Sequence, residues 1–104
     1  MYLESLGDIV GIRELYLVDE HGVSRSVQVL IGMPRPFPDS TGYYCPFQIV
    51  GLGSAEIRYA AGIDAIQALQ LVMSMIGVTL RFLGEGIGGS LRWEAGDERD
   101  LGFP

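Results

Sequence analysis

The chain contains few residues that could carry acid–base or nucleophilic chemistry. Cys45 is the only cysteine and His21 the only histidine. Cys45 lies in an apolar segment directly before Pro46, where burial would keep its thiol protonated and unreactive. His21 belongs to the polar segment DEHG, which is typical of an exposed turn. A catalytic Cys–His pair needs the two side chains to be adjacent, so we predict that the chain has no such catalytic pair.

Metal ligands are equally scarce. One histidine and one cysteine cannot form the His or Cys clusters that zinc requires. The acidic C-terminal segment carries Glu94, Asp97, Glu98 and Asp100, but it lacks the alternating acids, central glycine and terminal glutamate of a calcium loop. We therefore predict no metal site and interpret this segment as a solvated acidic turn.

Three glycines, Gly84, Gly86 and Gly89, have the GxGxxG spacing of dinucleotide-binding loops. That fingerprint needs a helix directly after the glycines, because the helix N-terminus binds the pyrophosphate. The segment that follows, 90–94, resembles a strand instead. We predict a hairpin turn between strands at 78–83 and 90–94, and we expect no nucleotide or other cofactor.

Composition narrows the possible partners and location. The 104 residues have a net charge of −6, and all seven basic residues are arginines. Nucleic-acid binding needs a basic surface that displaces counterions from phosphates, so we expect no nucleic-acid partner. Residues 1–11 lack the basic and apolar regions of a signal peptide, and the longest apolar stretch falls short of the ~20 residues that cross a bilayer. We expect a single domain over residues 1–104 that is cytoplasmic and makes no membrane contact.

Alternating apolar and polar residues predict strands over four further segments. These segments are residues 9–18, 24–33, 43–50 and 55–60. The first two would form a hairpin around the turn at 19–22, and the last two would form another, with Ile57 and Tyr59 directed inward. Because proline cannot donate to a strand ladder, Pro46 predicts an edge, a bulge or a strand beginning. The Pro-rich segment 33–42 would be a connecting loop.

A helix is predicted within residues 62–77, where Asp64 and Gln67 fit a capping box and Gly77 fits a C-terminal stop. Its apolar half would contain Ala65, Ile66, Ala68, Leu69, Val72, Met73, Met75 and Ile76. It would pack on the sheet at Leu15, Leu17, Val27, Val29, Ile31, Phe47 and Ile49. The predicted fold is therefore α+β, a mostly antiparallel sheet of about five or six short strands with one long amphipathic helix packed on one face. A half-barrel curled around the helix is the alternative.

The opposite half of this helix carries almost no charge. It presents Gln67, Gln70, Leu71 and Ser74, and three interpretations are open. The face is simply hydrated, or it is covered by the chain's own tail, or it contacts a second subunit or another protein. Amides and hydroxyls suit such a contact because they avoid the cost of burying a charge. Trp93 is either core or an anchor in such an interface.

Two classes of function remain. The first is a non-catalytic binding or interaction protein that self-associates as a homo-oligomer, such as a dimer, or that binds another protein. The second is a small-ligand binder or enzyme with a pocket near the Pro-rich loop, Tyr43, Tyr44 and Arg58. We expect the C-terminal tail to dock through Leu101 and Phe103, with a frayed end as the alternative.

Three stretches together resemble a known family: CPFQIVGLG, RYAAGIDAIQALQLVMSMIG and LRWEAGDERDLGFP. The family comprises small, uncharacterised bacterial proteins of about this length, classed only as a domain of unknown function. The resemblance runs over most of the chain, from the first strand to the C-terminal GFP. It implies a stand-alone protein but no activity, substrate or catalytic residue.

Overall fold

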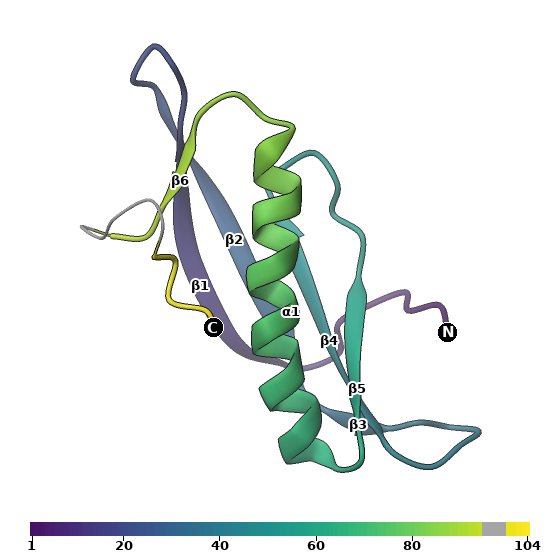
Figure 1. Ribbon diagram of the computed structural model, residues 1–104. Helices are drawn as coiled ribbons and strands as arrows, with labels where there is room; N and C mark the ends of the chain where they lie inside the picture. The colour runs from purple at the N-terminus through teal and green to yellow at the C-terminus, as the bar shows by residue number, and fades with distance from the viewer. Residues whose placement is uncertain (95–99) are drawn as a thin grey trace.

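Six antiparallel strands form one sheet, and one long helix crosses one face of it (Figure 1). The structure is a computed structural model that describes residues 1–94 and 100–104. Its elements are β1 (Ile9–Val18), β2 (Ser24–Gly32), β3 (Arg35–Pro36), β4 (Tyr43–Val50), β5 (Arg58–Gly62), α1 (Ala65–Glu85) and β6 (Ser90–Arg92). The predicted α+β class is confirmed, and the helix lies on an open sheet rather than inside a half-barrel.

The strand order explains why the helix crosses the whole sheet. β1 and β2 form the predicted hairpin, β4 pairs with β2 and β3 along one edge, and β5 pairs with its other edge. β6 lies at the far side of the sheet, on β1. The chain therefore leaves the sheet at β5 and returns at β6, and α1 spans the strands between them.

The ladder of β4 is interrupted where the sequence predicts it. β2 pairs only with Phe47–Val50 of β4, and β3 pairs only with Tyr43 and Tyr44. Pro46 falls in the gap between these two pairings. Because neither β2 nor β3 pairs at this position, no carbonyl of these strands needs the N–H that proline lacks. On the other edge of β4, Pro46 lies opposite Tyr59 of β5.

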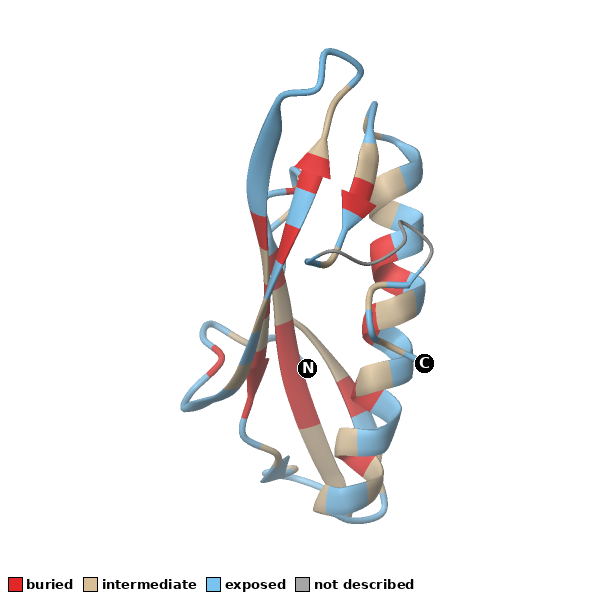
Figure 2. Cartoon of the chain, turned by 90° about the vertical axis from the view of Figure 1, so that its left-hand side faces the viewer, coloured by how far each residue is buried: buried red, intermediate tan, exposed pale blue. Residues whose placement is uncertain are grey.

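The space between the sheet and the helix holds the core (Figure 2). Every sheet position that we predicted to meet the helix is buried there. The buried residues from the helix are Ala68, Val72, Ile76, Thr79 and Leu80. The other face of the sheet is polar around Glu14, whose carboxylate accepts hydrogen bonds from Ser26 (2.6 Å) and Gln28 (2.7 Å). These bonds stabilise the charged form and lower the pKa of Glu14.

The predicted end of the helix is wrong. Gly77 does not stop α1, which continues to Glu85, so residues 78–83 form helix rather than a strand. Thr79 and Leu80 extend the buried face of the helix, and the Thr79 hydroxyl donates to the Met75 carbonyl one turn earlier (2.7 Å). Core packing therefore overrides the strand-like alternation of the segment.

The start of the helix is as predicted. Asp64 is the N-cap, and its carboxylate accepts the backbone N–H of Gln67 (2.8 Å). The Gln67 amide oxygen in turn accepts the backbone N–H of Ile63 (2.6 Å), one residue before the cap. Two otherwise unpaired backbone donors are thereby satisfied.

Two predicted orientations need correction. Ile66, expected on the sheet side of the helix, is 69% exposed, and Met75 is also exposed. In β5, Ala60 faces the core opposite Cys45, whereas Tyr59 faces the other side of the sheet opposite Pro46. The strand begins three residues later than predicted, at residue 58, and its inward positions are displaced accordingly.

By length and composition, α1 could cross a membrane. It has 21 residues, and an 18-residue window within it has a mean hydropathy of 1.5, so the expectation that no apolar stretch is long enough is wrong. One side of the helix nevertheless packs on the sheet through Val72, Ile76 and Leu80. The same length and hydropathy also occur in core helices of proteins that do not cross a membrane.

Candidate functional site

The outer side of α1 carries a row of exposed apolar side chains. Leu71, Met75, Val78 and Phe82 are spaced three or four residues apart, and therefore follow one flank of the helix. Their exposed fractions are 46%, 39%, 57% and 70%. We call these four residues the apolar row. Val78 and Phe82 lie beyond the predicted end of the helix at residue 77, and Met75 was expected on the sheet side instead.

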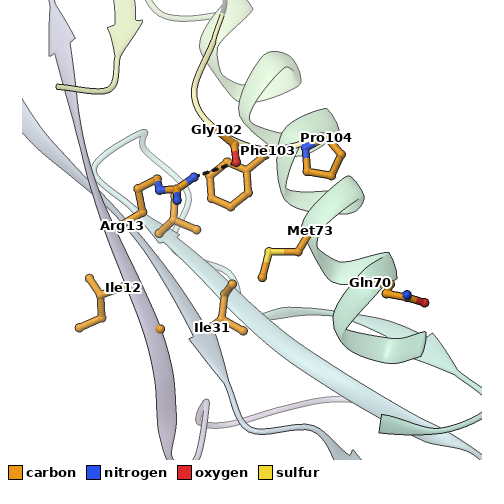
Figure 3. A pocket seen from close by; sticks show the side chains of 10 residues that line it. Ile12, Arg13, Ile31, Gln70, Met73, Gly102, Phe103 and Pro104 are labelled. Atoms are coloured by element: carbon orange, nitrogen blue, oxygen red, sulfur yellow. Dashed lines mark hydrogen bonds between the residues drawn. The ribbon is translucent and has the colours of Figure 1, made fainter. Parts of the chain in front are cut away.

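The polar residues predicted for this surface lie beside the row. Gln70 and Ser74 are exposed, whereas Gln67 is half-buried and already engaged in the N-cap. The side chain of Gln70 points away from the sheet (Figure 3). The structure therefore brings Gln70, Leu71 and Ser74 together on one accessible helix face.

Trp93 lies in a different place, in a cluster built around Arg13. The Arg13 guanidinium carbon is 4.0 Å from the centre of the Trp93 ring and 4.7 Å from that of Phe103. Its Nη1 donates to the carbonyl oxygens of Leu101 (3.2 Å) and Gly102 (2.9 Å). The predicted docking of the tail through Leu101 and Phe103 is confirmed, since both pack against the core. Trp93 thus holds the tail rather than joining Leu71 and Ser74.

A cavity of about 650 Å³ lies between β1, β2 and α1, next to the docked tail (Figure 3). Apolar side chains make most of its wall, and Arg13 is the charged side chain that lines it. The lining residues that Figure 3 shows between the layers include Ile31, Met73 and Phe103. This is a second candidate site, formed by elements that are distant in sequence.

The pocket predicted near the Pro-rich loop does not gather the expected residues. Tyr43 packs against the core, whereas Tyr44 lies on the opposite face of the sheet, in an aromatic cluster with Phe37 and Tyr59. Arg58 pairs with Phe47 across the β4–β5 ladder and forms an ion pair with a glutamate of its own segment. Tyr43 and Arg58 therefore share the helix side of the sheet, and Tyr44 does not.

Cys45 and His21 do not meet. Cys45 is buried, and its thiol donates to the Gly32 carbonyl (3.4 Å) at one end of the β1–β2 hairpin. His21 is exposed in the turn at the other end, about 25 Å away by the rise of a strand. Burial raises the pKa of Cys45 to about 11, so its thiol stays protonated near neutral pH.

The glycine-rich and acidic segments offer no ligand cradle in the part that is described. Gly84 lies in the last turn of α1 and Gly86 caps its C-terminus, where carbonyls rather than amides are free, the wrong polarity for a phosphate. Residues 95–99, with Asp97 and Glu98 of the predicted acidic turn, lie outside the described residues. Over residues 1–94 and 100–104, no three His, Cys, Asp or Glu side chains are placed to hold a metal ion.

Sequence reasoning missed Arg13 as a site residue, although a signal was present. The alternation of β1 places Arg13 on the same face as Leu15 and Leu17, which are buried. A charged residue on the core side of a strand needs partners. Those partners are the tail carbonyls and two aromatic rings, more than 75 residues away in the chain.

Comparison with known proteins identifies a family. The model of a domain of unknown function, DUF6968, matches residues 12–104. No curated protein and no solved structure matches the chain.

Proposed function

The chain belongs to the DUF6968 family, and we propose that it is a non-catalytic interaction protein that pairs with a second copy of itself through the outer face of α1. The apolar row carries this proposal. A solvent-facing helix surface is normally dominated by charged side chains, whereas here Leu71, Met75, Val78 and Phe82 are all exposed. Covering these side chains would stabilise the complex by about 25 cal/mol for each Å² of apolar surface removed from water.

The second copy is favoured as the occupant because two charged residues of the helix can pair between copies. Asp64 is the N-cap, and Arg81 lies one turn before Glu85, the last residue of the helix. In an antiparallel pair centred near Val72, Arg81 approaches the partner's Asp64. The two helix dipoles also oppose each other in this arrangement, which is favourable. A parallel pair would instead place Arg81 against the partner's Arg81.

The groups between these ends suit a shared interface. Gln70 and Ser74 lie near the centre of the proposed pair, where they can exchange hydrogen bonds with the partner without burying a charge. One helix face is smaller than the ~800 Å² that a standard interface buries on each partner. We therefore expect a dimer with a dissociation constant on the order of micromolar.

The protein is therefore proposed to be cytoplasmic and not to enter the membrane. Insertion of α1 into a bilayer would remove Val72, Ile76 and Leu80 from the sheet and expose the core that they cover. Pairing with a second copy covers the apolar row while leaving the fold intact.

Light scattering after size exclusion, over a range of protein concentrations, tests the proposal. We expect the wild type to approach twice the chain mass as the concentration rises, and Leu71→Arg to remain monomeric and folded. Ile66→Arg is the matched control, because Ile66 is an exposed apolar residue of the same helix but lies on its other flank. This control should dimerise like the wild type.

Three results would overturn the proposal. The first is a wild type that stays monomeric at every concentration. The second is a Leu71→Arg variant that still dimerises, and the third is an Ile66→Arg variant that loses the dimer equally.

A further inference from the structure

The cavity beside the tail lies on a part of β1 that has only one neighbour. Among the described residues, β6 covers only Tyr16–Val18 of this strand, and no other described strand pairs with its earlier residues on the side away from β2. Gly11 and Arg13 belong to this free part and line the cavity. Its volume of about 650 Å³ lies within the range of sites that hold small organic ligands.

The cavity is open because position 11 lacks a side chain. Gly11 lies opposite Ile31 in the β1–β2 ladder, on the side that faces the helix. A Cβ atom added to Gly11 would meet no heavy atom within 4 Å. Glycine within a strand weakens it, and often marks a place where another molecule approaches the backbone. Here it leaves free space between the strand and the helix.

The charged group of the cavity has hydrogen-bonding capacity left over. Nη1 of Arg13 donates to the carbonyls of Leu101 and Gly102. Among the described residues, no carboxylate forms an ion pair with Arg13, and its Nε and Nη2 have no hydrogen-bond acceptor. These two atoms form the edge of a guanidinium that binds a carboxylate through two parallel hydrogen bonds.

This guanidinium is also held in place before any ligand arrives. The rings of Trp93 and Phe103 lie at 4.0 Å and 4.7 Å from its carbon, and the tail carbonyls fix its Nη1. A fixed side chain loses little conformational entropy when it binds. The arginine is thus a ready anchor for an anion, even though the protein as a whole is acidic.

We propose that this cavity binds a small amphipathic carboxylate, with its carboxylate on the free edge of Arg13 and its apolar part against Ile31, Met73 and Phe103. The mostly apolar wall excludes strongly polar metabolites, and the single cation requires one negative charge. This site lies on the tail side of α1, whereas the apolar row follows the opposite flank. Gln70 borders both surfaces, but the proposed ligand contacts use no residue of the apolar row.

Decanoate and decanol are suitable probes, because they share an apolar chain and differ in charge. Trp93 is the only tryptophan and contacts Arg13, so its fluorescence reports on the cavity. Titration of the full chain should show saturable binding of decanoate and at least about tenfold weaker binding of decanol, the ratio expected from a charge-assisted hydrogen-bonded pair. Absence of decanoate binding, or equal affinity for both probes, would overturn the proposal.

Two variants separate the anchor from the cavity. Arg13→Gln should remove the preference for decanoate, so that the ratio of decanoate affinity to decanol affinity falls by about tenfold. Gly11→Leu should abolish binding of both probes, because the added side chain fills the free space while the Arg13 anchor remains in place. Its matched control is Gly86→Leu, because a Cβ at Gly86 also meets nothing within 4 Å but lies far from the cavity, at the end of α1.

Thermal melting and far-UV circular dichroism establish that each variant is folded. If Arg13→Gln fails to fold, Gly11→Leu and its control still decide the matter. Full decanoate affinity in a folded Gly11→Leu variant would contradict the proposed site, as would an equal loss in Gly86→Leu.

Discussion

The guanidinium carbon of Arg13 lies 4.0 Å from the centre of the Trp93 ring. This contact links β1, which contains Arg13, to Trp93, the residue directly after β6. The same guanidinium donates to two carbonyls of the tail and lies 4.7 Å from the ring of Phe103. One side chain therefore holds the C-terminal tail on the body of the protein.

Removing this side chain should release the tail. We expect Arg13→Ala to lower the free energy of unfolding by about 1–3 kcal/mol, because two hydrogen bonds and the cation–π contacts are lost. Trp93 emission should shift to longer wavelength as its ring becomes exposed. Urea denaturation followed by Trp93 fluorescence measures both effects. Arg25→Ala, at an exposed position of β2, is the control and should change stability by no more than about 0.5 kcal/mol.

The N-cap of α1 gives a second prediction. Asp64→Ala should cost about 1 kcal/mol of stability, because the backbone N–H of Gln67 loses its acceptor. Asp64→Asn should retain most of the wild-type stability, since asparagine caps a helix nearly as well as aspartate. Chemical denaturation of both variants, beside Asp39→Ala in an exposed loop, provides the comparison. An Asn variant as unstable as the Ala variant would contradict the capping role.

The buried thiol predicts how stability changes at alkaline pH. Burial raises the pKa of Cys45 from 9.0 to about 11, so the unfolded chain loses this proton at lower pH than the folded one. Between about pH 9 and 11 the unfolded state binds fewer protons, and stability should fall as the pH rises. Cys45→Ala should lack this component, which denaturation curves at several pH values would show. At pH 8 the native thiol should also react slowly with a disulfide reagent and react rapidly after unfolding.

Much of the fold follows from local patterns in the sequence. The β1–β2 hairpin, β4 and the helix N-cap were predictable because alternation and capping residues act over a few positions. The inward positions of β1, β2 and β4 followed from the same period of two residues, whereas those of β5 did not.

The errors have tertiary causes. Gly77 resembles a helix stop, yet a Cβ at this position would lie 2.7 Å from a backbone oxygen of Pro104. The glycine therefore makes room for the docked tail within a continuing helix. This reason for a glycine at position 77 cannot be inferred from the residues next to it in sequence. The apolar row was largely missed for the same reason, because Val78 and Phe82 lie in the helical turns beyond Gly77. The cavity needed Gly11 and the tail to be brought together by folding.

Intermolecular cross-linking through Ser74 tests the self-association most directly. Ser74 is exposed and lies near the centre of the proposed helix pair, where two cysteines would come within the ~7 Å between Cα atoms that a disulfide spans. Cys45 is buried and does not compete. We predict that mild oxidation converts Ser74→Cys into a covalent dimer, whereas Ile66→Cys, exposed on the other flank, remains a monomer on a non-reducing gel. A Ser74→Cys variant that does not cross-link, or an Ile66→Cys variant that cross-links as readily, would contradict the account.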